Sequence, residues 1–224
     1  MKSGSPKAFL FDLNGTMIDD MEYHLKIWYE VLTRDLGADL SWEEVRKNMY
    51  GKNDELLARV FGEGRFTSEQ VAEISQRKEE RYQALYKPHL DLLPGLFDFL
   101  NAAHLSGIKM AIGSAAIPYN INFVLDNLNI HHYFQAVVSA HDVLQSKPHP
   151  EVFLKAAELL AVKPADCIVF EDAPKGVEAA HHAGMKCVVM TTMHHPEEFN
   201  AYPNILLFTS DYTHEELKRL TGVE

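Results

Sequence analysis

The stretch AFLFDLNGT spans residues 8–16 and predicts a buried strand that ends in a turn. Its first half, Ala8–Phe11, is an uninterrupted apolar run, which is typical of a strand covered on both faces. Its second half starts at Asp12 and enters a Gly15-Thr16 turn. A carboxylate directly after a buried strand favours either a turn or a functional site at the edge of a sheet.

Further short apolar runs follow along the chain and alternate with helical patterns. Runs such as IVF and CVVM lack polar alternation, as expected of strands with helices on both sides. The alternation therefore predicts an α/β fold with a doubly wound, Rossmann-like parallel sheet. The later predicted strands are Lys109–Gly113, Ala136–Ser139, Cys167–Phe170, Cys187–Met190 and Ile205–Phe208, and the helices among them are Leu96–Ser106, Pro150–Leu160 and Pro174–Ala183.

The interval between the first two predicted strands is roughly a hundred residues long, far more than one crossover helix needs. Inside it, apolar residues recur at three- and four-residue spacing in segments separated by glycines. We expect an inserted helical cap domain over residues 20–89 and a core domain over residues 1–19 and 90–224. The cap helices are predicted at Glu22–Leu36, Trp42–Met49, Asp54–Phe61 and Ser68–Tyr86.

The composition argues against several classes of partner. The formal net charge is −11, with 21 basic and 32 acidic residues, so neither nucleic acid nor an anionic membrane would attract the chain. The polar N-terminus runs straight into a strand, which disfavours a signal peptide or membrane span, and we expect a monomeric cytoplasmic protein. The 2 cysteines, Cys167 and Cys187, each begin an apolar run and are expected to be buried thiols without a disulfide.

Polar groups follow the predicted strands at the edge where parallel sheets bind ligands. Asp12 follows the first strand, Ser114 the second and the pair Glu171-Asp172 the fourth, while a loop after the third carries Lys147. Each group alone is typical of a helix cap, a turn or a solvated surface. Their arrival at one edge favours a shared site.

This combination suits phosphoryl transfer, because a carboxylate such as Asp12 can attack phosphorus and form an aspartyl-phosphate. Two anions must then approach each other, so cations are required. We expect Mg²⁺ to be held by Asp12, Asp172 and a main-chain carbonyl. The expected ligands of the transferring phosphoryl group are Ser114, Lys147 and the amides of Gly15 and Thr16.

The motifs DLNGT, GSAA, SKPHPEVF and VFEDAPKGVEAA, in this order, resemble the four motifs of the haloacid dehalogenase superfamily across nearly the whole chain. The segment DDMEYH at residues 19–24 is similar to the β-phosphoglucomutase-like branch, which has a helical cap. The resemblance implies a Mg²⁺-dependent phosphatase or phosphotransferase that acts on a small phosphorylated substrate. Hydrolysis is the outcome that we expect.

The resemblance also implies roles for individual residues. Asp12 would be the nucleophile, and Ser114, Lys147 and the backbone of Ala115 would contact the phosphate. Asp12, Asp172 and the Asn14 carbonyl would ligate the metal, with Glu171 behind them. His24 would orient the substrate and the acid/base.

Asn14 departs from the family pattern, which places the general acid/base aspartate two residues after the nucleophile. An amide cannot donate a proton to a leaving alkoxide, and losing such a group typically costs about 10²–10⁴ in rate. Three interpretations remain open. The substrate has a good leaving group, as pyrophosphate or an acyl phosphate has; the asparagine is an engineered replacement; or the protein binds phosphorylated ligands without turnover.

The predicted cap departs as well, since Asp54 stands where the mutases of this branch place an arginine for a distal sugar phosphate. Lys52 and Lys78 are the nearest substitutes for substrate binding. This favours a hydrolase over a sugar-phosphate mutase, although the mutase stays an alternative. A phospho-accepting receiver domain also uses an aspartate, a hydroxyl and a lysine, but the long insert disfavours it.

Overall fold

The computed structural model describes residues 6–222. Their contacts divide the chain into two compact units, one made of Met1–Asp19 with Asp91–Glu224 and the other of Asp20–Leu90. The sequence prediction put the insert at residues 20–89. Within residues 6–222, no helix is long and apolar enough to cross a membrane.

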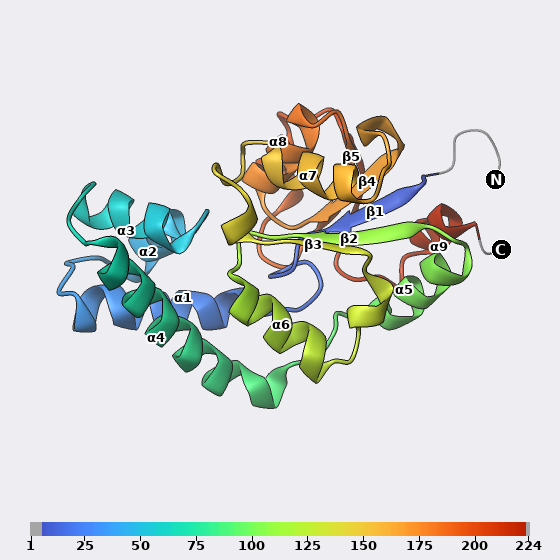
Figure 1. Cartoon of the computed structure of the whole chain (residues 1–224). Helices are drawn as coiled ribbons and strands as arrows, with labels where there is room; N and C mark the ends of the chain where they lie inside the picture. The colour runs from blue at the N-terminus through green and yellow to red at the C-terminus, as the bar shows by residue number, and fades with distance from the viewer. Residues whose placement is uncertain (1–5, 223–224) are drawn as a thin grey trace. The chain divides into compact units, whose positions relative to one another are not determined.

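The first unit is built on a sheet of parallel strands, which in the described part of the chain number six (Figure 1). Their spatial order is β3-β2-β1-β4-β5-β6, so the chain moves outward from β1 in one direction and then in the other. This confirms the predicted doubly wound α/β fold. The strands are β1 (Ala8–Phe11), β2 (Lys109–Gly113), β3 (Ala136–Val138), β4 (Cys167–Glu171), β5 (Lys186–Met190) and β6 (Ile205–Thr209).

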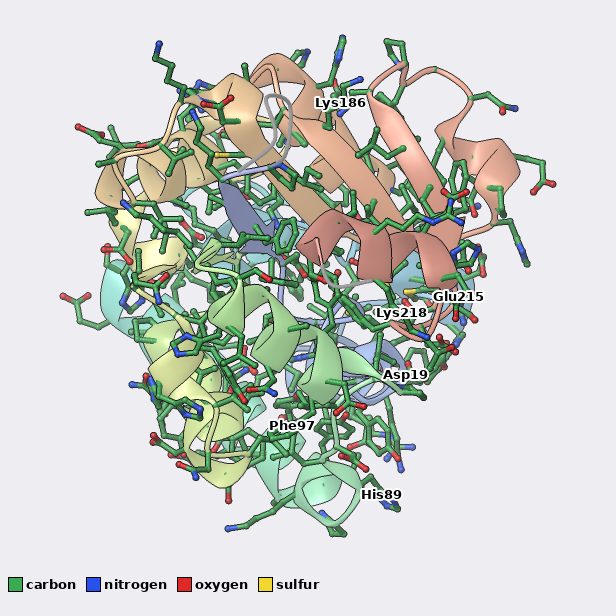
Figure 2. The ribbon with its side chains drawn as sticks, turned by 90° about the vertical axis from the view of Figure 1, so that its right-hand side faces the viewer. Asp19, His89, Phe97, Lys186, Glu215 and Lys218 are labelled. Atoms are coloured by element: carbon green, nitrogen blue, oxygen red, sulfur yellow. The ribbon has the colours of Figure 1, made fainter. Side chains whose placement is uncertain are left out.

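Helices cover both faces of this sheet, as Figure 1 shows for α7 and α8 on one side and α5 and α9 on the other. Prolines stand at the first turns of α6 and α8, where the missing N–H costs no helical hydrogen bond. The helices of this unit are α5 (Leu96–Leu105), α6 (Pro118–Asn127), α7 (Glu151–Leu159), α8 (Pro174–His182) and α9 (Glu215–Thr221). Figure 2 shows Glu215 and Lys218 on α9, where their charged groups lie 2.7 Å apart.

The central strand β1 is buried along its whole length, and its side chains alternate between the two faces. Phe9 and Phe11 enter an aromatic layer, in which Phe11 stacks on Phe170 of β4 at a centroid distance of 4.7 Å. Phe9 stacks on Phe99 of α5 at 5.2 Å. These rings fix α5 against the sheet.

The opposite face of β1 packs under α7 and α8 through smaller side chains. Leu10 belongs to a buried cluster with Phe153 of α7 and Val177 of α8. Cys167 and Cys187 are members of the same cluster, and both are buried free thiols, as the sequence predicts. Burial raises the pKa of the Cys167 thiol to about 11, which keeps it protonated and unreactive.

The second unit consists of helices, as the three- and four-residue spacing predicts. Two of them begin with a reciprocal capping box, Ser41 with Glu44 and Thr67 with Gln70, which satisfies the first amides of each helix. The predicted first helix is interrupted, because its last turn, Val31–Asp35, is a π-helix. The helices are α1 (Met21–Glu30), α2 (Trp42–Asn48), α3 (Asn53–Phe61) and α4 (Ser68–Tyr86).

The aromatic layer gives a stability prediction. Phe9→Ala should lower the free energy of unfolding by about 3–5 kcal/mol, because it removes a fully buried ring from a layer that cannot close over the cavity. Phe97→Ala is the matched control, since this ring on α5 is 55% exposed (Figure 2) and should change stability by about 0.5 kcal/mol or less. Urea unfolding followed by circular dichroism measures both, and equal losses would contradict the assigned packing.

Candidate active site

Three neighbouring strands bring polar residues from distant parts of the chain to one edge of the sheet. Asp12 follows β1, and its backbone N–H donates to the Phe170 carbonyl of β4 at 2.9 Å. Ser114 follows β2 on the other side of β1, where Phe11 pairs with Ile112. The last residue of β4 is Glu171. The predicted meeting of strand ends is therefore present for β1, β2 and β4.

Lys147 joins two of these strand ends. Its ammonium donates to Asp12 Oδ1 at 2.5 Å and to Glu171 Oε1 at 2.6 Å, and its side chain is only 9% exposed. Burial alone would lower the pKa of Lys147, but the carboxylates of Asp12 and Glu171 outweigh it and raise that pKa above the ordinary value. Lys147 is thus a fixed positive charge against the predicted nucleophile.

Glu171 is held from both sides. One oxygen accepts from Lys147, and the other accepts from the backbone N–H groups of Asp172 at 2.9 Å and Ala173 at 3.0 Å. A Cβ on Gly176, in the first turns of α8, would lie 1.8 Å from this carboxylate, so only glycine leaves room for it. Both Glu171 oxygens thus accept hydrogen bonds, and a place for Glu171 in the metal site stays a prediction.

Asp172 is buried beside two other carboxyl groups. Burial raises the pKa of Asp172 well above its ordinary value, and the charges of Glu171 and Asp12 raise it further, while Lys147 opposes them. Three carboxylates thus share one ammonium in a buried place. The excess negative charge and the oxygen donors fit a divalent cation such as Mg²⁺.

Among residues 6–222, no group of three or more Asp, Glu, His or Cys side chains is arranged so that it could hold a metal ion. This does not argue against Mg²⁺, which commonly binds through one or two carboxylates and completes its shell with waters and substrate phosphate.

The segment Asp12–Ile18, called the nucleophile loop below, is a tight turn closed by its own hydrogen bonds. The Gly15 N–H donates to the Ile18 carbonyl at 2.9 Å, and the Thr16 N–H makes a longer bond of 3.4 Å to the Leu13 carbonyl. Gly15 has φ of +76°, which glycine adopts without strain. Both amides that the sequence analysis assigned to phosphate binding are therefore used inside the turn.

The Thr16 side chain makes a contact outside the turn, which the motifs did not predict. Its hydroxyl donates to Asp172 Oδ1 at 3.3 Å and so links the nucleophile loop to the residue after β4. Asn14 lies in the same loop and is half-buried. The loop thus connects the predicted nucleophile with the second candidate metal ligand.

Ser114 and Ala115 lie at the carboxyl end of β2, as predicted. Ser114 is almost fully buried, its N–H donates to the Val138 carbonyl at 3.0 Å, and its hydroxyl oxygen accepts from the Ala116 N–H at 3.1 Å. The hydroxyl proton remains able to donate to a phosphoryl oxygen. Ala115 is half-buried in the turn that follows.

The other three predicted site residues, His24, Lys52 and Lys78, belong to the helical unit Asp20–Leu90. Lys52 precedes α3, and its backbone N–H donates to the Glu55 carboxylate at 3.0 Å. Lys78 is only 2% exposed and its ammonium donates to the Glu79 carboxylate at 2.9 Å, so its charge is already compensated. A substrate phosphate would have to compete with Glu79 for it.

His24 lies beside Lys78, and the contact assigns its tautomer. The Lys78 ammonium is 2.6 Å from His24 Nδ1, and an ammonium can only donate, so Nδ1 is the acceptor. The ring proton is then on Nε2, which faces Asp20 Oδ2 at 3.2 Å. Asp20 also accepts from the Tyr82 hydroxyl at 2.5 Å. Asp20 belongs to the DDMEYH segment, whereas Tyr82 lies in no motif, and the contacts of these two residues with His24 and with each other were not predicted from the sequence.

Comparison with known proteins identifies the family of the chain. The chain matches the haloacid dehalogenase-like hydrolase family over residues 9–190. It is 34% identical to the β-phosphoglucomutase of Bacillus subtilis over 187 residues, which cover 81% of this chain and 82% of that protein. It is 31% identical to the fructose-1-phosphate phosphatase YqaB of Escherichia coli over 182 residues, which cover 81% of this chain and 94% of that protein.

The fold agrees with that of a solved member. The crystal structure of a β-phosphoglucomutase from Clostridium difficile superposes with a TM-score of 0.82 at 27% identity and covers 97% of each chain. Family, fold and relatives thus confirm the resemblance found in the motifs. The chain belongs to the haloacid dehalogenase-like hydrolases and is an enzyme of their phosphatase and phosphotransferase kind.

Proposed function

We propose that this enzyme hydrolyses a small phosphorylated metabolite, with Mg²⁺ as cofactor and Asp12 as the residue that accepts the phosphoryl group. The observation that carries the proposal is the contact of 2.5 Å between Lys147 and Asp12 in a buried, carboxylate-rich cluster. The lysine offsets the negative charge of the aspartate at the strand end, so a phosphate dianion can approach that aspartate.

In the proposed reaction an Asp12 carboxylate oxygen attacks phosphorus while the bond from phosphorus to the leaving oxygen breaks. The leaving oxygen takes the bonding electrons and needs a proton if it is an alkoxide. Water then attacks phosphorus, the bond from phosphorus to the Asp12 oxygen breaks, and its electrons return to the carboxylate as inorganic phosphate leaves; the proton lost by the water passes to solvent. In this proposal Lys147 and the Ser114 hydroxyl bind the phosphoryl oxygens.

Asp12, Asp172 and the Asn14 main-chain carbonyl would hold the metal ion. When bound, Mg²⁺ supplies positive charge that offsets the phosphoryl oxygens as the two anions meet. The protein contributes the oxygen donors and their support, since Thr16 holds Asp172 and Lys147 holds Asp12.

Asn14 favours a substrate whose leaving group needs no proton. Phosphoanhydrides and acyl phosphates release a stable anion, so pyrophosphate and acetyl phosphate are the second substrate class.

Relatives of this chain carry the names of a fructose-1-phosphate phosphatase and a β-phosphoglucomutase, which points to sugar phosphates. A mutase outcome, or binding without turnover, would follow if the phosphoenzyme resists water or never forms.

The first test replaces the nucleophile. Asp12→Asn keeps the shape of the side chain but removes its nucleophilicity, so phosphate release should fall by about 10⁴-fold or more. Asp98→Asn, an exposed carboxylate on α5, is the matched control and should keep full activity. A Mg²⁺-dependent phosphate-release assay measures both, and substantial turnover by Asp12→Asn would show that the nucleophile is misassigned.

The second test concerns the metal. Asp172→Asn should raise the Mg²⁺ concentration needed for half-maximal activity by about 10²-fold, because residues that merely support metal ligands already cost 10–100-fold. Glu158→Gln removes an exposed carboxylate from α7 and should leave the Mg²⁺ dependence unchanged. An unaltered Mg²⁺ titration of Asp172→Asn would argue against this ligand.

The third test restores the missing acid. Asn14→Asp should accelerate the hydrolysis of sugar monophosphates by about 10²-fold or more, since their alkoxide leaving group needs a proton. Cleavage of pyrophosphate and acetyl phosphate should change far less. Measuring phosphate release from all three kinds of substrate with both proteins separates the classes. Strong native pyrophosphate cleavage without any gain on monophosphates would favour the phosphoanhydride substrate.

A further inference from the structure

Three consecutive carbonyl oxygens of the nucleophile loop, those of residues 15–17, accept hydrogen bonds from three other segments of the same unit. The bonds run from Thr192 Oγ1 to the Gly15 oxygen at 2.6 Å, from the Tyr212 hydroxyl to the Thr16 oxygen at 3.1 Å, and from the Leu93 N–H to the Met17 oxygen at 2.9 Å. The donors follow β5, follow β6 and precede α5. The loop is therefore held from outside as well as by its own bonds.

Tyr212 is itself firmly held. It is buried, its ring stacks on Phe170 at a centroid distance of 5.7 Å, and its backbone N–H donates to the Pro94 carbonyl at 2.8 Å. A Cβ on Gly95 would lie 2.9 Å from the Tyr212 carbonyl carbon, and Gly95 has φ of +78°, so the fold keeps this place clear for the tyrosine. Burial raises the pKa of Tyr212 well above its ordinary value, with further raising by Asp12 and Asp172, which keeps the hydroxyl a donor.

These bonds determine how the loop peptides are oriented. A peptide unit is planar, so fixing the direction of one C=O fixes the direction of the next N–H. The Gly15 oxygen and the Thr16 N–H belong to one such plane, and Thr16 also carries the hydroxyl that contacts Asp172. Without the bond from Thr192 or the bond from Tyr212, we expect the loop peptides to rotate more freely. Asp12, the Asn14 carbonyl and the Thr16 hydroxyl that contacts Asp172 would then be held less firmly.

We infer that Thr192 and Tyr212 are positioning residues of the phosphoryl-transfer reaction, which act by holding the nucleophile loop from the C-terminal half of the chain. The inference rests on the proposed function, in which this loop carries the nucleophile and a metal ligand. Neither hydroxyl is assigned a contact with substrate. The motifs of the sequence do not contain either residue.

The experiment removes each hydroxyl while keeping the packing. Tyr212→Phe and Thr192→Val should lower kcat for Mg²⁺-dependent hydrolysis of p-nitrophenyl phosphate by about 10- to 100-fold, because small displacements of reacting groups have effects of this size. KM should change by less than about threefold. Thr192→Ser keeps the hydroxyl and should restore most of kcat. Tyr202→Phe is the control, because its hydroxyl donates to the Glu178 side chain at 3.4 Å and not to the loop.

A second measurement does not depend on activity. Hydrogen exchange of the peptide covering residues 12–18 should be at least about tenfold faster in Thr192→Val and Tyr212→Phe than in the wild type, Thr192→Ser and Tyr202→Phe. Should Tyr212→Phe fail to fold, the valine and serine variants at position 192 decide alone.

The inference would be overturned by a kcat within twofold of the wild type in the folded variants, or by a loss of kcat that Thr192→Ser does not restore. Unchanged exchange of the loop would overturn it as well. A wild-type protein that releases no phosphate from any substrate would defeat the proposed function instead, and the exchange comparison would still show whether the two residues hold the loop.

Discussion

The site depends on the two contacts that the buried ammonium of Lys147 makes with carboxylates. It lies between Asp12 after β1 and Glu171 at the end of β4, two like-charged groups that adjacent strands bring together. Without a cation between them, their repulsion and their burial would both oppose the folded state. One lysine cannot balance Asp172 as well, and the raised pKa of that carboxyl reflects the remaining excess of negative charge. Protonation of Asp172 can relieve this excess of negative charge, and so can the divalent cation of the proposed function.

The strands supply the rigidity that this charge arrangement requires. Phe11 and Phe170 precede Asp12 and Glu171, and their stacked rings fix the two strand ends relative to each other. Tyr212 continues the same layer, since it stacks on Phe170 and its hydroxyl reaches the nucleophile loop. The aromatic layer thus serves the site as well as the core.

The sequence allowed the strands to be predicted to within about a residue or two, because fully buried parallel strands have continuous apolar runs. The sequence also predicted that Asp12, Lys147 and the Glu171-Asp172 pair lie at one edge of the sheet, because the carboxyl ends of parallel strands lie on the same side. It could not show which groups hold these residues. Thr192 follows β5 and Tyr212 follows the edge strand β6, neither in a motif, and the role that we infer for them depends on contacts across roughly 180 to 200 positions of the chain. The tautomer of His24 likewise depends on a contact with Lys78 that no local pattern contains.

The charge balance gives a physical context for Asn14. An aspartate at this position would bring a further negative charge close in sequence to Asp12, whose cluster already has more carboxyl groups than its one ammonium can balance. Asparagine keeps the size of the side chain without that charge, but it removes the proton donor. In the proposed function, Asn14 therefore favours leaving groups that depart without a proton, unless another group supplies one.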